Sequence, residues 1–237
     1  MHATRRLWVW LGVVFLLSFA VLGWMGREIY LAAPPIPEKV ISEKGDVLFS
    51  HQQVELGQQA WRAAGGQQLG SVWGHGSYVA PDWSADWLHR EALALREALA
   101  NERYGKPVRD LALDQKAAID AAMKIEMRTN TYDAALGVIR VSTARARAIR
   151  EVARHYEGLF GDDAALQTLR EQYAMTAGAL ANAEDRAALA AFFFWSSWAA
   201  ATDRPGETRL SYTSNWPHEP LVENTPTTGS GMSSGPF

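Results

Sequence analysis

The sequence predicts a mainly α-helical protein: one N-terminal transmembrane helix, followed by a helical domain that carries small β-hairpins. Three observations point to this class. An uncharged apolar run covers residues 7–26, apolar residues recur at helical spacing in several later segments, and two short β-like patterns flank glycine-containing turns. With 237 residues and a hydrophobic content of 48%, the chain is large enough to bury the core of one or two domains.

The apolar run at residues 7–26 is long enough to cross a lipid bilayer. Twenty helical residues at about 1.5 Å each span the hydrocarbon core of about 30 Å, so we assign residues 7–29 to a transmembrane helix. Basic residues precede the run, which places residues 1–6 in the cytoplasm and the domain outside it. A cleaved secretory signal ending near Ala32 is the alternative, although the apolar region of such signals is typically about 7–15 residues long.

A Pro-rich linker at residues 30–37 leads to a domain at residues 38–222, and a polar, flexible tail is expected at residues 223–237. Hairpins are expected around residues 40–49 and 132–141. Helices are expected from a capping box at Ser50, from Ser84 to Tyr104, from a cap at Asp114 to about Met127, from Thr143 to Phe160, from Asp162 or Asp163 to about Ala174, and from Asn182 to Thr202. The last helix is apolar all round at Phe192–Trp198, which favours burial over contact with lipid or another protein.

Composition excludes several kinds of chemistry. The chain has no cysteine, so it forms no disulfide, zinc–thiolate site, thiol nucleophile or covalent Cys-x-x-Cys-His haem attachment. The net charge of −3 and the lack of a basic face make nucleic acid an unexpected partner. The 6 histidines are scattered and none lies in the apolar run, so spacing alone predicts no metal site and no active site.

Three local features remain as candidates. Residues 65–91 combine five glycines and a proline with large aromatic side chains, which predicts either a packed Ω-like loop or a functional one. His218 beside Glu219 is either an acid/base pair or a hydrogen-bonded loop element. A secreted hydrolase is the weakest hypothesis, because no nucleophile–base spacing accompanies its candidate carboxylates; these are Asp82, Asp86 and Glu91.

Three long motifs carry a family resemblance: Gly65–Glu91, Ala191–Gly206 and Tyr212–Val222. Together, and in this order, they resemble the N-terminal region of the quinol-dependent, single-subunit nitric oxide reductases, which are related to the haem-copper oxidase superfamily. The resemblance implies a first transmembrane helix and a periplasmic cytochrome c-like domain without its haem. A multi-helix membrane core follows in that family. There haem b, haem b3 and non-haem iron convert two NO to N2O and water, with electrons from quinol.

For this chain the resemblance implies a non-redox periplasmic domain and first anchor in a bacterial inner membrane, inactive alone and without a cofactor of its own. Its partners would be the lipid bilayer and the catalytic core, and through that core quinol and NO. Because the family's second transmembrane helix should begin near Phe237, we expect a fragment or a split-gene product. A free-standing single-span membrane protein with a periplasmic protein- or ligand-binding domain is the alternative.

The stretch Gly74-His-Gly-Ser-Tyr-Val-Ala-Pro-Asp82 is also similar to a segment of the cytochrome c subunit of two-subunit nitric oxide reductases. A Cys-x-x-Cys-His motif precedes it there, and Gly66, Leu69 and Gly70 stand at the positions of those ligands here. Side chains must then fill the haem volume, because protein interiors are close-packed. The candidates are Trp61, Trp73, Trp83 and Trp87.

The same resemblance implies a metal role for Gly76 and Tyr78, since a glycine carbonyl and a tyrosine of the similar segment reach a calcium ion shared with the catalytic subunit. Calcium takes about 6–8 oxygen ligands, so two groups are not a site. We therefore expect negligible calcium affinity for this chain alone and a shared site only with the membrane core. The alternative is that Tyr78 is a packed loop aromatic.

Overall fold

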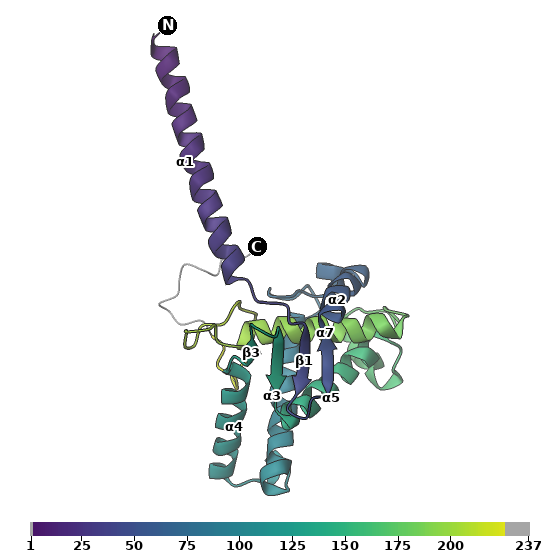
Figure 1. Cartoon of the computed structure of the whole chain (residues 1–237). Coiled ribbons are helices and arrows are strands. Elements are labelled where there is room, and N and C mark those ends of the chain that lie inside the picture. The colour runs from purple at the N-terminus through teal and green to yellow at the C-terminus, as the bar shows by residue number, and fades with distance from the viewer. Residues whose placement is uncertain (1, 226–237) are drawn as a thin grey trace. The chain divides into compact units, whose positions relative to one another are not determined.

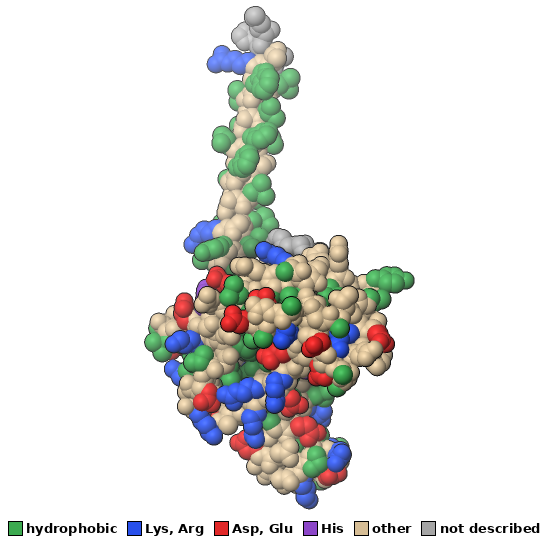
Figure 2. All heavy atoms as spheres, turned by 90° about the vertical axis from the view of Figure 1, so that its right-hand side faces the viewer, with side chains coloured by type: hydrophobic (Ala, Val, Ile, Leu, Met, Phe, Trp, Pro, Cys, Tyr) green, Lys and Arg blue, Asp and Glu red, His purple; other side chains and the backbone are tan. Residues whose placement is uncertain are grey.

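A computed structural model describes residues 2–225 of the chain, which divides after residue 35 into two units. The first unit contains helix α1 (His2–Ala32). Within residues 2–225 it is the one helix long and apolar enough to cross a membrane, with a mean hydropathy of 2.2 over Thr4–Ala32. Figure 2 shows hydrophobic side chains along this helix and basic ones towards its two ends. α1 is therefore a candidate membrane anchor, and it continues beyond residue 29 to Ala32.

The second unit begins with a small sheet of four strands, β1 (Lys39–Ser42), β2 (Val47–Ser50), β3 (Tyr132–Asp133) and β4 (Val138–Val141). The β1–β2 and β3–β4 pairs are antiparallel, so both predicted hairpins are confirmed. The strand order is β2-β1-β4-β3, because β1 and β4 pair in parallel and join the hairpins into one sheet. Buried Val40 and Ile139 are partners in this central pair.

Six further α-helices follow in the described chain: α2 (His51–Ala63), α3 (Trp83–Tyr104), α4 (Leu113–Arg128), α5 (Thr143–Phe160), α6 (Gln167–Gln172) and α7 (Ala183–Ala201). Side chains cap the N-termini of four of them, where the first backbone N–H groups lack helical partners. The caps are Ser50 for α2, Asp82 for α3, Ser142 for α5 and Asn182 for α7. The capping box of Ser50 with Gln53 and the cap at Asn182 are confirmed.

One predicted helix start is wrong, and one predicted helix is divided. Helix α4 begins after Ala112 instead of Asp114, because the Gln115 side chain accepts the Ala112 backbone N–H at 3.1 Å and closes the first turn. The helix expected from Asp162 or Asp163 is divided: Asp163 caps a 3₁₀ turn (Ala164–Leu166), and only Gln167–Gln172 is α-helical.

Helix α7 is the centre of the second unit. It packs against α2, α3 and α5, while α3 and α4 pack on each other and extend away from it (Figure 1). Every residue from 188 to 201 is buried, which confirms the predicted burial of Phe192–Trp198. Helix α2 approaches α7 at Gly57, where a Cβ would lie 2.0 Å from the Ala188 carbonyl oxygen. Only a residue without a side chain fits this contact.

Candidate functional site

The loop at residues 65–82 is organised by the buried carboxylate of Asp82. Its Oδ2 accepts the Ser71 hydroxyl at 2.7 Å and the Gly74 backbone N–H at 2.6 Å. Its Oδ1 accepts the Ser84 hydroxyl and, at 3.0 Å, the Ala85 N–H at the start of α3. Burial raises the pKa of Asp82, and these hydrogen bonds oppose the rise. The group holds the loop to the helix and is closed to substrate.

Trp83 packs against this loop and is fully buried. Its Nε1 donates to the Leu69 carbonyl at 2.8 Å, and its ring stacks on Phe193 at 5.6 Å between centroids. Gly70 has a φ of 110°, and a Cβ there would lie 2.4 Å from Trp83 Nε1. The indole thus lies directly against two of the three positions that correspond to haem ligands in the resemblance, and the residues present do not fit a covalently attached haem.

The other three tryptophans expected in the core are also packed against aromatic side chains. Trp73 donates to the Ser196 carbonyl at 2.8 Å. Trp87 is fully buried, stacks on Tyr156 at 5.2 Å and donates to Glu91 at 2.8 Å. Trp61 lies 6.0 Å from Phe192, centroid to centroid. The side chains join the loop, α2 and α3 to the buried face of α7, so this part of the loop is structural.

Tyr78 differs from these tryptophans. Its side chain is fully exposed within the described residues, so it does not pack against residues 2–225. The tip is a turn in which Ser77 N–H donates to the Ala80 carbonyl at 2.8 Å. Gly76 has a φ of 82° and donates its N–H to Ser71 Oγ at 2.7 Å. Residues 2–225 hold no cluster of three or more His, Asp or Glu side chains suited to a metal.

The carboxylates named in the hydrolase hypothesis form hydrogen bonds and ion pairs inside the domain. Asp86 Oδ2 accepts the Tyr156 hydroxyl at 2.6 Å and Arg90 Nε at 2.8 Å. Glu91 pairs with Arg145 at 2.7 Å, and both side chains are buried. Asp82, Asp86 and Glu91 are all engaged in these internal bonds, and a hydrolase site at these positions has no support in the geometry.

Of the two readings of His218 beside Glu219, the acid/base pair is not formed, whereas Glu219 is a hydrogen-bonded loop element whose Oε1 accepts the Leu221 N–H at 3.0 Å. Glu219 Oε2 instead lies 2.7 Å from Nδ1 of His89 on α3, a contact across 130 residues of sequence that no local pattern signals. His218 packs its ring against Trp216 at 5.4 Å, and its Nδ1 is buried without a hydrogen-bond partner in the described structure. Burial lowers the pKa of His218. The ring of His75 also lies close to Trp216, 5.9 Å away between centroids.

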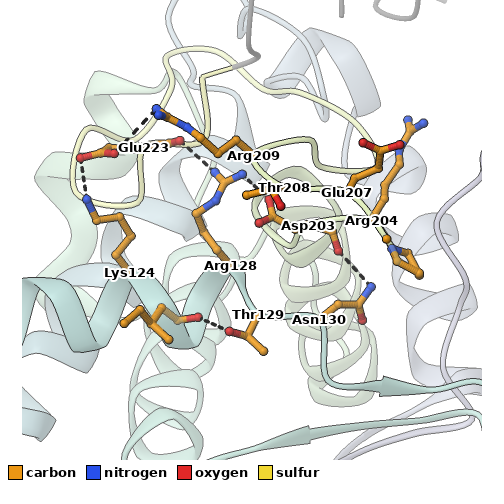
Figure 3. Close-up of a pocket in the computed structure, with 13 residues that line it drawn as sticks. Lys124, Arg128, Thr129, Asn130, Asp203, Arg204, Glu207, Thr208, Arg209 and Glu223 are labelled. Carbon is orange, nitrogen blue, oxygen red and sulfur yellow. Dashed lines mark hydrogen bonds and ion pairs between the residues drawn. The ribbon is translucent and has the colours of Figure 1, made fainter.

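Sequence reasoning also missed a cavity of about 600 Å³ at the C-terminal end of α4. Four cationic and three anionic side chains line it, and Figure 3 shows them around the loop that follows α7. They are Lys124, Arg128, Arg204, Arg209, Asp203, Glu207 and Glu223. Because they come from three separate segments, no spacing within the sequence reveals the cluster.

Comparison with known proteins identifies the family. No curated protein sequence matches the chain. Residues 37–218 match the family model of the NorB cytochrome c-like domain of nitric oxide reductase, and the match covers more than half of the 237 residues. The matched region begins at the linker and includes the sheet, helices α2 to α7 and the segment through His218. The chain therefore belongs to the NorB cytochrome c-like domain family of nitric oxide reductases.

Proposed function

We propose that this chain is the non-redox extracytoplasmic domain and first membrane anchor of a respiratory nitric oxide reductase that draws electrons from quinol. In this proposal the haem b, haem b3 and non-haem iron of NO reduction lie in a membrane core outside residues 1–237. The chain supplies a folded domain and a docking surface, and it carries no haem itself. The family match supports the context of nitric oxide reduction.

The observation that carries the non-redox assignment is the position of Trp83. Its ring packs among buried aromatic side chains and its Nε1 hydrogen bonds to Leu69, beside Gly70. Interiors are close-packed, so a haem at this place would have to expel the indole and its neighbours. The chain also has no cysteine for covalent attachment. We expect the purified chain to be colourless, and a stoichiometric Soret band after haem-replete expression would overturn the assignment.

We further propose that the loop tip faces the membrane core and helps to hold a shared calcium ion there. The exposure of Tyr78 supports this reading, because its hydroxyl has no partner within the described residues. In an enzyme that contains both parts, Tyr78→Phe should lower the calcium content while leaving the fold of this domain unchanged. Metal analysis and the melting temperature measure the two effects, and an unchanged calcium content would remove Tyr78 from the site.

The membrane assignment follows from α1. We propose a bacterial inner membrane, with the N-terminus in the cytoplasm and residues 38–222 in the periplasm. The basic residues before the apolar run support this orientation.

One experiment tests the proposed function as a whole. The tagged chain is purified in mild detergent from membranes of its source organism grown on nitrate at low oxygen. We expect it to bring haem b and quinol-dependent NO consumption with it, either in one longer polypeptide or in a complex. A chain that purifies alone, without haem b and without NO consumption, would contradict the proposal.

That second outcome would favour the other candidate function, a free-standing single-span protein that binds a ligand outside the cytoplasm. The cavity of about 600 Å³ is the observation that supports it.

A further inference from the structure

Two loops of the second unit contribute a surface that lacks charged side chains. Residues 63–81 contain no Asp, Glu, Lys or Arg, and residues 210–222 contain only Glu219. This carboxylate is buried and lies 2.7 Å from the imidazole of His89. Charged residues make up 21% of the whole chain, so the two segments differ sharply from the rest of the sequence.

The exposed side chains of these loops are aromatic or apolar. Within residues 2–225, Tyr78 is fully exposed, Trp216 is 51% exposed and Val79 is 44% exposed. His75 connects the two loops: it is exposed, it precedes Tyr78 by three residues, and its ring lies 5.9 Å from that of Trp216. These four residues form one surface, which we call the aromatic patch.

The loop after α7 is held in one conformation by buried amide groups. Asn224 Nδ2 donates to Asn215 Oδ1 at 2.9 Å and to the Ala200 carbonyl on α7 at 3.1 Å. Asn224 Oδ1 accepts the backbone N–H of Glu219 at 2.8 Å. The two asparagines thus join the ends of a short Ω-like loop, and Trp216 is presented from its surface.

The loop that carries Tyr78 is also ordered from within, through the buried carboxylate of Asp82. Binding to a protein costs about 0.5–1.5 kcal/mol for each flexible side chain that becomes immobilised, and pre-ordered loops avoid part of this cost. A fluid lipid surface adapts to any shape, so it gains little from loops that are already fixed. The order of both loops therefore favours a protein as the partner.

The composition of the aromatic patch is typical of the centre of a protein–protein interface. Such centres are depleted of charged residues and enriched in Trp and Tyr, and a few of these side chains carry most of the binding energy. The rings of His75 and His218 both contact Trp216, which fixes the position of the indole. Trp216 is therefore the expected principal contact.

The length of the connection to α1 limits where the partner can be. Helix α1 ends at Ala32 and the second unit begins at Ile36, so three residues separate them. Such a connection spans at most about 14 Å. With α1 in a membrane, the domain stays close to the membrane surface, where a protein embedded in the same membrane has a high effective concentration.

We propose that the aromatic patch docks on the extracytoplasmic surface of the membrane core, with Trp216 as the principal contact. The inference rests on the proposed function, because it takes the catalytic core as the partner. It adds the loop after α7 to the contact expected for the tip at Tyr78. The surface that receives the patch should be apolar and uncharged, because a charge there would lose its water without gaining a partner.

Labelling of single cysteines tests the proposal, since the chain has no cysteine of its own. A water-soluble maleimide is added to the Val79→Cys variant, and peptide mass spectrometry follows the labelled site. In an enzyme that contains the membrane core, labelling should be about tenfold slower than in the chain alone in detergent, because even a modest docking free energy hides the thiol most of the time. Glu151→Cys, exposed on α5, is the control and should react equally in both.

Trp216→Ala is the decisive variant. It should weaken docking about 30-fold, the effect of losing an energetically dominant side chain, and return labelling of Val79→Cys to within about twofold of the isolated chain. Leu136→Ala is the matched control, because Leu136 is a large apolar residue, 58% exposed, outside both loops. If Trp216→Ala does not fold by circular dichroism, Tyr78→Ala replaces it. Labelling that stays slow in the folded variant would overturn the role of Trp216.

The outcomes separate the docking surface from the proposed function. An enzyme that contains haem b and consumes NO, but labels at Val79→Cys as fast as the isolated chain, would contradict the docking surface alone. A chain that purifies without haem b would contradict the proposed function and this inference together. Slow labelling of the chain alone in nanodiscs of phosphatidylcholine and phosphatidylglycerol would assign the patch to lipid and overturn the docking on protein.

Discussion

At the residue scale, the stability of the domain depends on a few positions where a single atom fills a packing space or a hydrogen bond. Gly70 leaves room for the indole of Trp83, and Asp82 satisfies donors from the loop and from α3. His155 is partly buried beside Tyr156 and leaves its Nε2 without a partner in the described structure. Each position yields a measurable change in stability.

We expect Gly70→Ala to lower the free energy of unfolding by about 3 kcal/mol or more. A φ of 110° is unfavourable for alanine, and the new Cβ would lie 2.4 Å from Trp83 Nε1 and 2.6 Å from the Pro81 carbonyl. Gly105→Ala is the matched control, because Gly105 has a φ of 63° with no atom within 4 Å. It should cost about 1 kcal/mol. Equal costs in chemical denaturation would show that Trp83 does not restrict this position.

The stability of the domain should fall as the pH is lowered from about 6.5 to about 4, in part because of His155. Burial, and then the charge of Arg90, lowers the pKa of His155 to about 4 in the folded state from 6.5. Between these values the unfolded chain binds a proton that the folded chain does not, so stability rises with pH in this window. His155→Gln should reduce the slope. An unchanged slope in unfolding experiments across the window would contradict the assignment.

At the scale of secondary-structure elements, α3 and α5 are connected by the buried pair of Glu91 and Arg145. Arg145 also donates to the Glu126 carbonyl at 3.0 Å, and Trp87 donates to Glu91. Both charges are desolvated, so each depends on the other. The pair therefore helps to set how α3 and α5 pack against each other, although no local sequence pattern links the two helices.

Glu91→Gln should destabilise the domain by about 3–5 kcal/mol, because it leaves the Arg145 charge buried and uncompensated. The double variant Glu91→Gln with Arg145→Met should recover part of this loss. The exposed pair of Glu102 and Arg147, 3.1 Å apart, is the control, and Glu102→Gln should cost no more than about 1 kcal/mol. A double-mutant cycle measured by urea unfolding gives the coupling, and no recovery in the double variant would argue against it.

Elements could be predicted from the sequence where their cause is local. The capping box at Ser50 and the full span of α5 depend on neighbouring residues, and both were predictable. The parallel pairing of β1 with β4 joins segments about a hundred residues apart, and periodicity carries no such information. For the same reason the sequence could not show that the fold brings His89 to Glu219.

At the scale of the whole molecule, the sequence indicated an anchor, a domain and a family through different signals. The anchor is predicted by a long apolar run without charged residues, and the family is indicated by three long motifs. The cavity did not follow from either, because its charged side chains come from α4, the loop after α7 and Glu223. Figure 2 shows acidic and basic side chains interspersed over one face of the domain, in keeping with a partner other than nucleic acid.

We expect protease added to intact spheroplasts to remove residues 38–222. We expect the basic residues before the apolar run to keep the N-terminus in the cytoplasm, with the domain on the other side of the membrane. A tag at the N-terminus should remain protected until the cells are lysed, and immunoblots for both ends measure the result. Protection of the domain in intact spheroplasts, with cleavage only after lysis, would reverse the orientation.

The place of α7 in the chain has a consequence for biosynthesis. This helix is the last one in the described chain, yet α2, α3 and α5 all pack on it. At about 5–20 residues per second, the 150 positions between His51 and Ala201 take roughly 8–30 s to synthesise. During that time the faces of α2, α3 and α5 that pack on α7 have no partner helix, and the β1–β2 hairpin alone is at best marginally stable. The nascent domain therefore cannot complete its fold until α7 is synthesised, and until then it is accessible to chaperones and proteases.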